Sequence, residues 1–197
     1  LILSHGDRDH IGGVDVLLDA MPVAKVYGHG GLACRPGQEI SLGGSARLRF
    51  LNGDLSALGV VPSAESDNDV SCVVLIEYLN SRFLLMGDVE RSREKALVRF
   101  WREELSANVL IAAHHGSNTS SSATFLKWAK PDYAVFSAGR GNRFGHPAAT
   151  VVDRFAERNT TMFNTAVDGA ITFTIEGSAL TIATMRDGTI PSWLRVP

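Results

Sequence analysis

The stretch that decides the fold is Ser4-His5-Gly6-Asp7-Arg8-Asp9-His10-Ile11-Gly12-Gly13. It follows the apolar Leu1-Ile2-Leu3 and precedes an amphipathic segment that begins at Val14. We expect a strand that carries these polar residues at its carboxyl end, with the glycine pair allowing a tight turn into a helix. Because two aspartates in one loop repel each other unless a cation offsets their charge, the pattern predicts a metal-binding loop. The alternative is a polar surface loop with chance histidines.

The rest of the chain alternates between strand and helix patterns. This alternation predicts a mixed α/β (α+β) layered architecture, in a single domain over residues 1–197. We expect an irregular excursion over 53–69. The expected helices are 14–20, 90–105, 120–130 and 147–158, and the expected strands are 24–27, 46–51, 70–78, 82–86, 109–111, 133–137, 161–164, 170–175 and 179–185.

Composition narrows the possible functions. The formal net charge of the 197 residues is −2, so any contact with DNA must be local rather than a property of the whole surface. A candidate basic cluster, or alternatively an ordinary solvated face, contains Arg140, Arg143, Arg154, Lys127 and Lys130. The chain has no run of 18 apolar residues, so we expect no membrane span in it.

The two cysteines give no indication of a covalent or metal framework. Cys34 and Cys72 lie far apart and outside any C-x-x-C pattern. We therefore expect two buried or half-buried thiols, with neither a disulfide nor a cysteine zinc site.

Two further polar clusters follow predicted strands. Gly87-Asp88 comes after 82–86; alone it indicates only a turn, but after the first motif it predicts a metal ligand. His114-His115 follows a fully apolar strand, and adjacent residues on an extended strand point to opposite faces. We therefore expect one of the pair to ligate, with His115 as the ligand and His114 as a neighbouring contact, although the two roles can be reversed.

A last cluster occupies the loop Ser137-Ala138-Gly139-Arg140-Gly141-Asn142-Arg143-Phe144-Gly145-His146-Pro147. It joins a strand to a helix, a position that favours an anion, and its two arginines add positive charge. We expect His146 to hydrogen-bond a phosphate or to protonate a leaving oxygen. The alternative is a histidine that only caps the loop.

These motifs resemble known families. The first resembles the H-x-H-x-D-H signature of the metallo-β-lactamase superfamily, with Asp7 in place of the second histidine. An oxygen ligand there moves the preference from zinc towards manganese or magnesium. Together with N-D-x-S at 68–71, H-H-G-S at 114–117 and G-x-x-N-x-F/Y-G-H-P at 139–147, the loop resembles the hydrolase domain of ComEC-type competence proteins, inner-membrane DNA-uptake channels.

The resemblance implies an αββα sandwich with a metal site at one edge between two sheets. In that fold the signature loop follows several strands, so we expect a fragment of a longer chain that lacks its N-terminal strands. The implied cofactors are two divalent metal ions, with Mn²⁺ favoured and Zn²⁺ or Mg²⁺ as alternatives. The implied metal ligands are His5, Asp7, Asp9, His10, Asp88 and His115, with Asp88 bridging the two ions.

The resemblance also implies roles in catalysis and substrate binding. The usual third histidine of the superfamily is absent, and Asn68 and Ser71 stand in its place as weak contacts. Asp9 is expected to orient the nucleophilic water, beside His114 and His146 as further catalytic residues. The expected substrate contacts are Asn68, Ser71, Ser117, Arg140, Asn142, Arg143 and His146.

The function implied is that of a phosphodiesterase, a DNase that degrades the DNA strand that is not imported. The implied partners are DNA and the membrane channel portion of the same polypeptide. The whole protein would then reside in the inner membrane, with this domain soluble and on the periplasmic or extracytoplasmic side. Two alternatives remain: a hydrolase of small phosphodiesters (phosphorylcholine-esterase-like) or lactams, and a non-catalytic module that binds DNA or docks on the channel.

Overall fold

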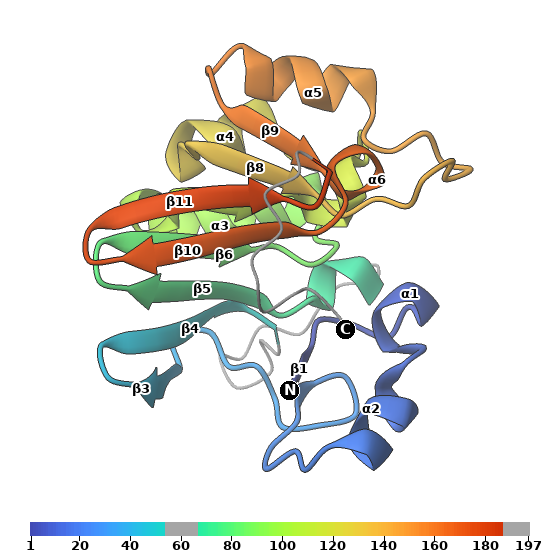
Figure 1. Ribbon diagram of the computed structural model, residues 1–197, viewed down its shortest axis with the longest axis vertical. Coiled ribbons are helices and arrows are strands. Elements are labelled where there is room, and N and C mark those ends of the chain that lie inside the picture. The colour runs from blue at the N-terminus through green and yellow to red at the C-terminus, as the bar shows by residue number, and fades with distance from the viewer. Residues whose placement is uncertain (54–66, 187–197) are drawn as a thin grey trace.

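A seven-stranded mixed sheet forms the centre of the computed structural model, which describes residues 1–53 and 67–186. Strands β3 to β6 form an antiparallel meander, and β6 to β9 run parallel with helical crossovers (Figure 1). The strand order follows the sequence: β3 Glu39–Gly43, β4 Ala46–Asn52, β5 Val73–Tyr78, β6 Ser81–Leu85, β7 Val109–Ile111, β8 Tyr133–Phe136 and β9 Thr161–Asn164.

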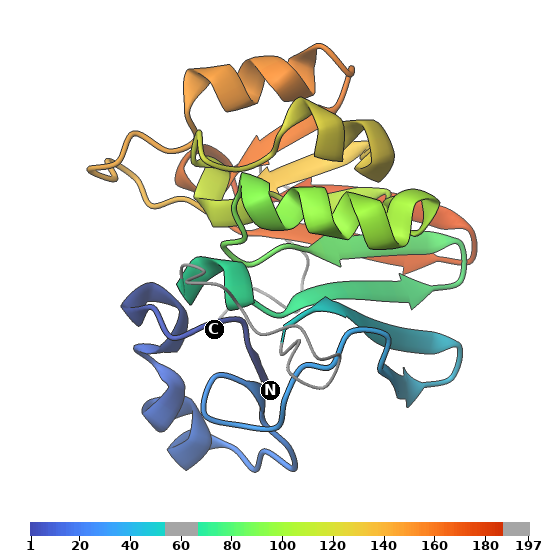
Figure 2. The ribbon, with the colours of Figure 1, turned by 180° about the vertical axis from the view of Figure 1, so that it is seen from behind.

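Each face of this sheet is covered by a different kind of layer. Helices α3 (Arg91–Trp101), α4 (Ala123–Ala129) and α5 (Ala149–Ala156) lie on one face, as Figure 2 shows. The antiparallel hairpin of β10 (Ile171–Glu176) and β11 (Ala179–Thr184) lies on the other. Its Phe173 ring packs against the rings of Phe83, Tyr133 and Phe163 on the sheet. Burial of the apolar face between sheet and helices forms the main core.

The N-terminal part forms a smaller unit beside β4 and β5. Strands β1 (Ile2–Leu3) and β2 (Tyr27–Gly28) pair in parallel, and helices α1 (Arg8–Ile11) and α2 (Val14–Ala20) lie between them in sequence. A second core cluster joins Ile2 and Tyr27 to Phe50 and Val74 of the large sheet. This contact fixes the end of β1, and so the start of the ligand-rich loop, against the large sheet.

The mixed α/β architecture expected from the sequence is confirmed, and most elements lie within a few residues of their predicted bounds. The helix expected over 90–105 ends at Trp101, where Arg102 has a φ of 40°, and continues as a short 3₁₀ turn. Strand β3 was not predicted. Most of the excursion expected over 53–69 lies outside the described residues, as do parts of the predicted 1–197 domain. Within the described ranges, the structure has no helix long and apolar enough to cross a membrane.

The expectation of two free thiols is wrong. Cys34 and Cys72 are both buried, as expected, but they form a disulfide with a Cα–Cα distance of 5.8 Å. That separation is within the range that a disulfide requires. The bond joins residues 38 positions apart, which the fold brings together, so no local sequence pattern announces it.

Candidate metal centre

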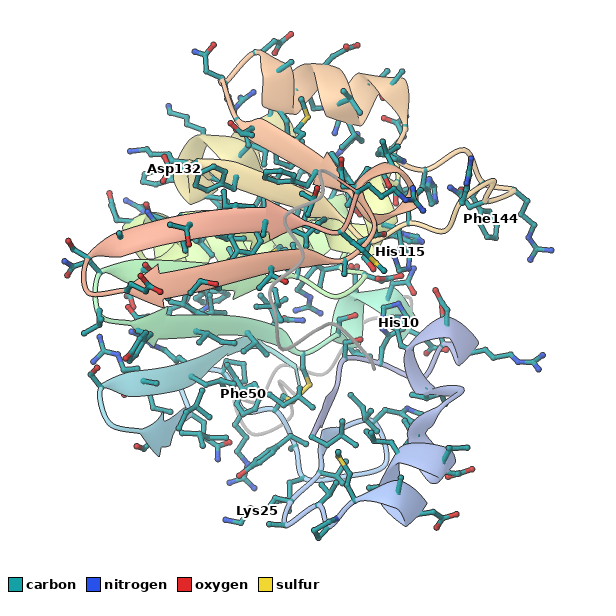
Figure 3. All side chains as sticks on the ribbon, viewed as in Figure 1. His10, Lys25, Phe50, His115, Asp132 and Phe144 are labelled. Atoms are coloured by element: carbon teal, nitrogen blue, oxygen red, sulfur yellow. A yellow bond between two sulfur atoms is a disulfide. The ribbon has the colours of Figure 1, made fainter. Side chains whose placement is uncertain are left out.

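The predicted polar clusters meet at one edge of the large sheet. The carboxyl ends of parallel strands lie at the same edge, so the segments that follow β6, β7 and β8 are neighbours there. The loop after β1 reaches the same place, because Ser4 accepts a backbone hydrogen bond from Cys72 just before β5. In Figure 3 His10 and His115, which are 105 residues apart in sequence, point towards each other at this edge.

Asp88 lies at the centre of the cluster. Its carboxylate is buried, and histidines from two motifs surround it. One carboxylate oxygen lies 3.3 Å from His10 Nε2. The other lies near the Nε2 atoms of His115 (3.4 Å), His114 (3.9 Å) and His5 (4.0 Å). Both carboxylate oxygens of Asp88 therefore face imidazole nitrogens of the cluster.

Two sets of side chains in the described residues have ligand atoms close enough together to hold an ion. One set is His5, His10 and Asp88, and the other is Asp9, His10 and His115; within each, the ligand atoms lie within 4.8 Å of one another. Asp7 is in neither set, but its Oδ2 lies 3.5 Å from His5 Nε2. The structure therefore brings together all six residues predicted as ligands.

The electrostatics of the cluster keep Asp88 ionised. Burial raises the pKa of this carboxyl, but hydrogen bonds from His10 and His115 outweigh it and hold the pKa well below its usual range. The hydrogen bond to Asp88 in turn raises the pKa of His115 to about 9. The site thus presents an ionised carboxylate surrounded by imidazoles. A bound cation could take the place of the protonated imidazoles as the partner of this carboxylate.

A buried nitrogen without a partner tests whether a metal fits. His5 Nε2 is fully buried, and it forms no hydrogen bond in the described part of the chain. Such a nitrogen is costly unless something coordinates it. Imidazole nitrogens and carboxylate oxygens are ligands of Zn²⁺ and Mn²⁺. The residues present therefore fit divalent cations, with His5 and Asp88 on one side and Asp9 and His115 on the other. His10 can serve either group, because its single free nitrogen, Nε2, can coordinate only one cation.

Two serines hold the imidazoles in this orientation. Ser4 Oγ lies 3.1 Å from His5 Nδ1 and 3.0 Å from His10 Nδ1. Ser71 Oγ lies 3.3 Å from His5 Nδ1 and accepts a hydrogen bond from the backbone N–H of Asp88. Partners on Nδ1 leave Nε2 free to ligate. Ser71 was expected to make hydrogen bonds here, whereas the role of Ser4 was not predicted.

The N-D-x-S segment, residues 68–71, is held by residues that the sequence did not single out. Asn52 donates to the carbonyls of Asp69 and Ser71, and it is buried. Asp69 accepts from the backbone N–H of Glu90 and from the hydroxyl of Ser92. Asn68 accepts the backbone N–H of Ser71 on its backbone carbonyl, and its side chain stays a predicted weak contact. Asp69 and Ser71 therefore both tie the N-D-x-S segment to the turn at Asp88.

The geometry assumed for His114 and His115 is wrong. The pair does not continue an extended strand, because both residues have left-handed φ angles, 51° and 56°, in a tight turn. Both Nε2 atoms consequently face Asp88. His115 Nδ1 donates to the carbonyl of Ser137 at 2.8 Å, the arrangement typical of a metal-ligating histidine. His114 Nδ1 lies 3.3 Å from the Thr119 hydroxyl.

A close contact between glycine and proline joins this turn to the last motif. Gly116 has a φ of 87°, and a Cβ there would lie 2.6 Å from Cβ of Pro147. The carbonyl of Gly116 also accepts the N–H of Ala148. The H-H-G-S turn and the G-H-P turn are thus packed directly against each other, which places His146 beside His114, with 5.9 Å between ring centroids.

The loop 137–147 forms one wall of a cavity beside the cluster. Asp9, His115, Asn142, Phe144, His146 and Thr165 are among the residues that line this cavity of about 430 Å³. Asn142 stabilises the loop, since it donates to the carbonyls of Gly139 and His146 and accepts from the N–H of His146. Burial, then the charges of His114 and His115, lower the pKa of His146. The neutral imidazole is therefore favoured, which suits a hydrogen bond to phosphate better than proton donation.

Four other residues predicted to contact substrate or DNA have different surroundings. Arg140 and Arg143 are exposed on the same loop. Ser117 is buried and lies 3.1 Å from the Thr119 hydroxyl, so it belongs to the turn rather than to the cavity lining. Arg154 donates to the carbonyls of Ser120 and Ser121, so its guanidinium stabilises the loop before α4. The exposed members of the basic cluster expected for DNA are therefore Arg140, Arg143, Lys127 and Lys130.

Comparison with known sequences decides the family. The sequence pattern described as "Metallo-beta-lactamase superfamily" matches residues 1–140, which include every ligand of both sets. The chain belongs to the metallo-β-lactamase superfamily. The expected fold is confirmed by this match, and the chain carries the histidine and aspartate groups of a metal-dependent hydrolase.

Proteins of similar sequence include some that are named after competence. "Competence protein ComA" of Neisseria gonorrhoeae is 33% identical over 176 residues, covering 88% of this chain and 25% of that protein. "Recombination protein 2" of Haemophilus influenzae is 34% identical over 204 residues, covering 100% and 25%. "ComE operon protein 3" of Bacillus subtilis is 28% identical over 187 residues, covering 88% and 24%. This metallo-β-lactamase chain spans about a quarter of the length of these relatives.

The solved structures are less similar in sequence to this chain than the relatives described above. The metallo-beta-lactamase fold protein YhfI from Bacillus subtilis is 17% identical, with a TM-score of 0.48 over 83% of this chain and 72% of that one. The family assignment rests on the sequence match.

Proposed function

We propose that this metallo-β-lactamase domain is a manganese-favouring phosphodiesterase that degrades single-stranded DNA as part of a competence uptake protein. The observation that carries the proposal is the convergence of His5, His10 and His115 on the buried carboxylate of Asp88, beside an open cavity. The names of the relatives support a role in DNA uptake. The partners proposed are DNA and the channel portion of the same polypeptide.

The site offers the groups that such a reaction needs. Divalent cations bound there would supply Lewis-acid charge and an activated water. Asp9 is well exposed, with its Oδ2 3.1 Å from His115 Nε2, so its carboxylate can hold and orient the attacking water at the cavity mouth. His146 would hydrogen-bond a non-bridging phosphate oxygen. Arg140 and Arg143 would attract the DNA backbone to this side of the domain.

The disulfide supports an extracytoplasmic place for the domain. Disulfides persist in oxidising compartments and are rare in the cytosol. A bond between Cys34 and Cys72 is therefore expected of a domain exposed outside the cytoplasmic membrane. This agrees with the proposed position of the domain beside an inner-membrane channel.

The test separates three functions. Wild type and Asp9→Asn would be compared for degradation of single-stranded DNA with Mn²⁺, and DNA binding would be measured separately. Manganese-dependent degradation that Asp9→Asn loses, with binding retained, supports the nuclease. Zinc-dependent turnover of small esters without DNA cleavage would contradict it in favour of a small-molecule hydrolase. DNA binding without degradation in either protein would favour a non-catalytic module. This alternative is considered because the third histidine usual in the superfamily is absent.

A further inference from the structure

Phe144 stands out on the wall of the cavity. It is 66% exposed on the loop between β8 and α5, which projects from the domain in Figure 3. A single exposed apolar side chain needs no explanation by itself. Phe144 differs because it lines the cavity that also contains Asp9 and His115. Its ring therefore provides an apolar surface beside Asp9 and His115, two of the ligands at the proposed reaction site.

The ring belongs to a stack of flat groups. The rings of Phe144 and His146 lie 5.7 Å apart between centroids with their planes 17° apart. On Phe144 the guanidinium carbon of Arg143 lies 4.8 Å from the ring centroid. A planar cation beside an aromatic ring is a recurring way to bind an unpaired nucleobase together with its phosphate.

The loop that carries the stack is held in place. Asn142 makes three hydrogen bonds to Gly139 and His146, which enclose residues 143–145. Phe144 is thus presented by a fixed turn rather than by a loose one, which lowers the entropic cost of binding.

We propose that Phe144, with Arg143, is a stacking platform for an unpaired nucleobase next to the scissile phosphate, and so a specificity-determining residue for single-stranded nucleic acid. The inference rests on the proposed nuclease function, because the occupant is taken to be the substrate of that site. Bases stacked inside a duplex have no free face to offer, so the platform selects single strands and frayed ends.

The experiment compares wild type, Phe144→Ala, Phe144→Tyr and the control Phe100→Ala, whose ring is similarly exposed (71%) but lies on α3. The substrates are a short single-stranded DNA oligomer and an abasic oligomer of equal length. We expect Phe144→Ala to raise KM for the base-bearing oligomer about 5- to 150-fold with kcat kept. The abasic oligomer should be cleaved equally by wild type and by Phe144→Ala. Phe144→Tyr and Phe100→Ala should resemble wild type.

A second readout reports stacking directly and does not need cleavage. Fluorescence of 2-aminopurine in the oligomer, measured with EDTA, should be quenched on binding to wild type and to Phe144→Tyr but not to Phe144→Ala. The proposal is overturned if Phe144→Ala binds the oligomer and quenches its fluorescence like wild type. It is also overturned if the substitution raises KM equally for the base-bearing and the abasic oligomer. If wild type cleaves neither oligomer with Mn²⁺, the nuclease function fails, and the quenching alone decides whether the platform stands. Absence of binding by wild type overturns both.

Discussion

The buried wall of the metal centre is formed by the buried His5, Ser71 and Asp88 with the half-buried Ser4. The open rim, formed by Asp7, Asp9 and most of the loop 137–147, faces solvent. Side-chain exposure is 0% for His5 and 5% for Asp88, but 52% for Asp7 and 64% for Asp9. On the buried wall every ligand has a fixed partner behind it. The rim is left free to meet water and substrate.

This difference separates two tasks. A preorganised wall holds cations in a set geometry without further ordering at the moment of reaction. An exposed rim can exchange water and admit a flexible polymer. Substitutions in the buried wall should therefore affect metal binding and folding, and substitutions at the rim should affect substrate use.

The largest expected effect comes from removing the central anion of the buried wall. Asp88→Asn leaves the imidazoles without their shared carboxylate, so we expect metal affinity and hydrolysis to fall by more than about 100-fold, beyond the usual effect of residues that only orient ligands. Calorimetric metal titration and DNA degradation measure the two losses. The control is Asp19→Asn, an exposed aspartate on α2. Near-normal metal binding by Asp88→Asn would refute its predicted role as a metal ligand.

Breaking the disulfide should loosen the support behind the buried wall. Cys72 directly follows Ser71, so the bond to Cys34 anchors the segment before β5 whose Ser71 contacts His5. For a loop of this length we expect about 4 kcal/mol of lost stability. Denaturant unfolding with and without reductant measures it, and a Cys34→Ser, Cys72→Ser double variant should not respond to reductant. An unchanged midpoint in reduced wild type would show that the bond contributes nothing.

A glycine substitution tests the close packing of the H-H-G-S turn against the G-H-P turn. Gly116→Ala adds a Cβ 2.6 Å from Pro147 and strains a φ of 87°, so we expect a loss of at least about 2 kcal/mol. Gly141→Ala, with a φ of 68° and open space around it, carries the strain without the clash. It should cost about 1 kcal/mol. Chemical denaturation compares them, and equal losses would mean that the close packing of the two turns is unimportant.

The smallest of these effects concerns the unpredicted serine. Ser4→Ala removes the hydroxyl beside both Nδ1 atoms, and we expect metal affinity to fall about 10- to 100-fold with stability nearly unchanged. Ser45→Ala, in an exposed turn, is the matched control. Calorimetric titration of both variants with Mn²⁺ provides the comparison. Wild-type affinity in Ser4→Ala would leave Ser71 as the sole orienting hydroxyl.

What the sequence predicts well is local. The strand that ends at Leu3, the strand ends before Asp88 and His114, and the ligand types in the first loop follow from periodicity and side-chain chemistry within a few positions. The six ligands that the family resemblance implied lie together at one edge of the sheet. The local patterns also carried the family resemblance that the sequence match confirms.

What the sequence misses is tertiary. Ser4, Asn52 and Asp69 are common residue types whose partners lie on distant segments, so nothing local distinguishes them. The left-handed turn at His114 and His115 occurs at residues that rarely adopt it, because packing imposes it rather than residue type. Cys34 and Cys72 likewise come together only in the folded chain, within the second core cluster.

Metal stoichiometry tests the account most directly. Calorimetric titration of the metal-free chain with Mn²⁺ should show two ions per chain, and Asp88→Asn should lose this saturable binding. The absence of saturable binding by wild type, or two-site binding that Asp88→Asn leaves unchanged, would contradict the metal centre described above.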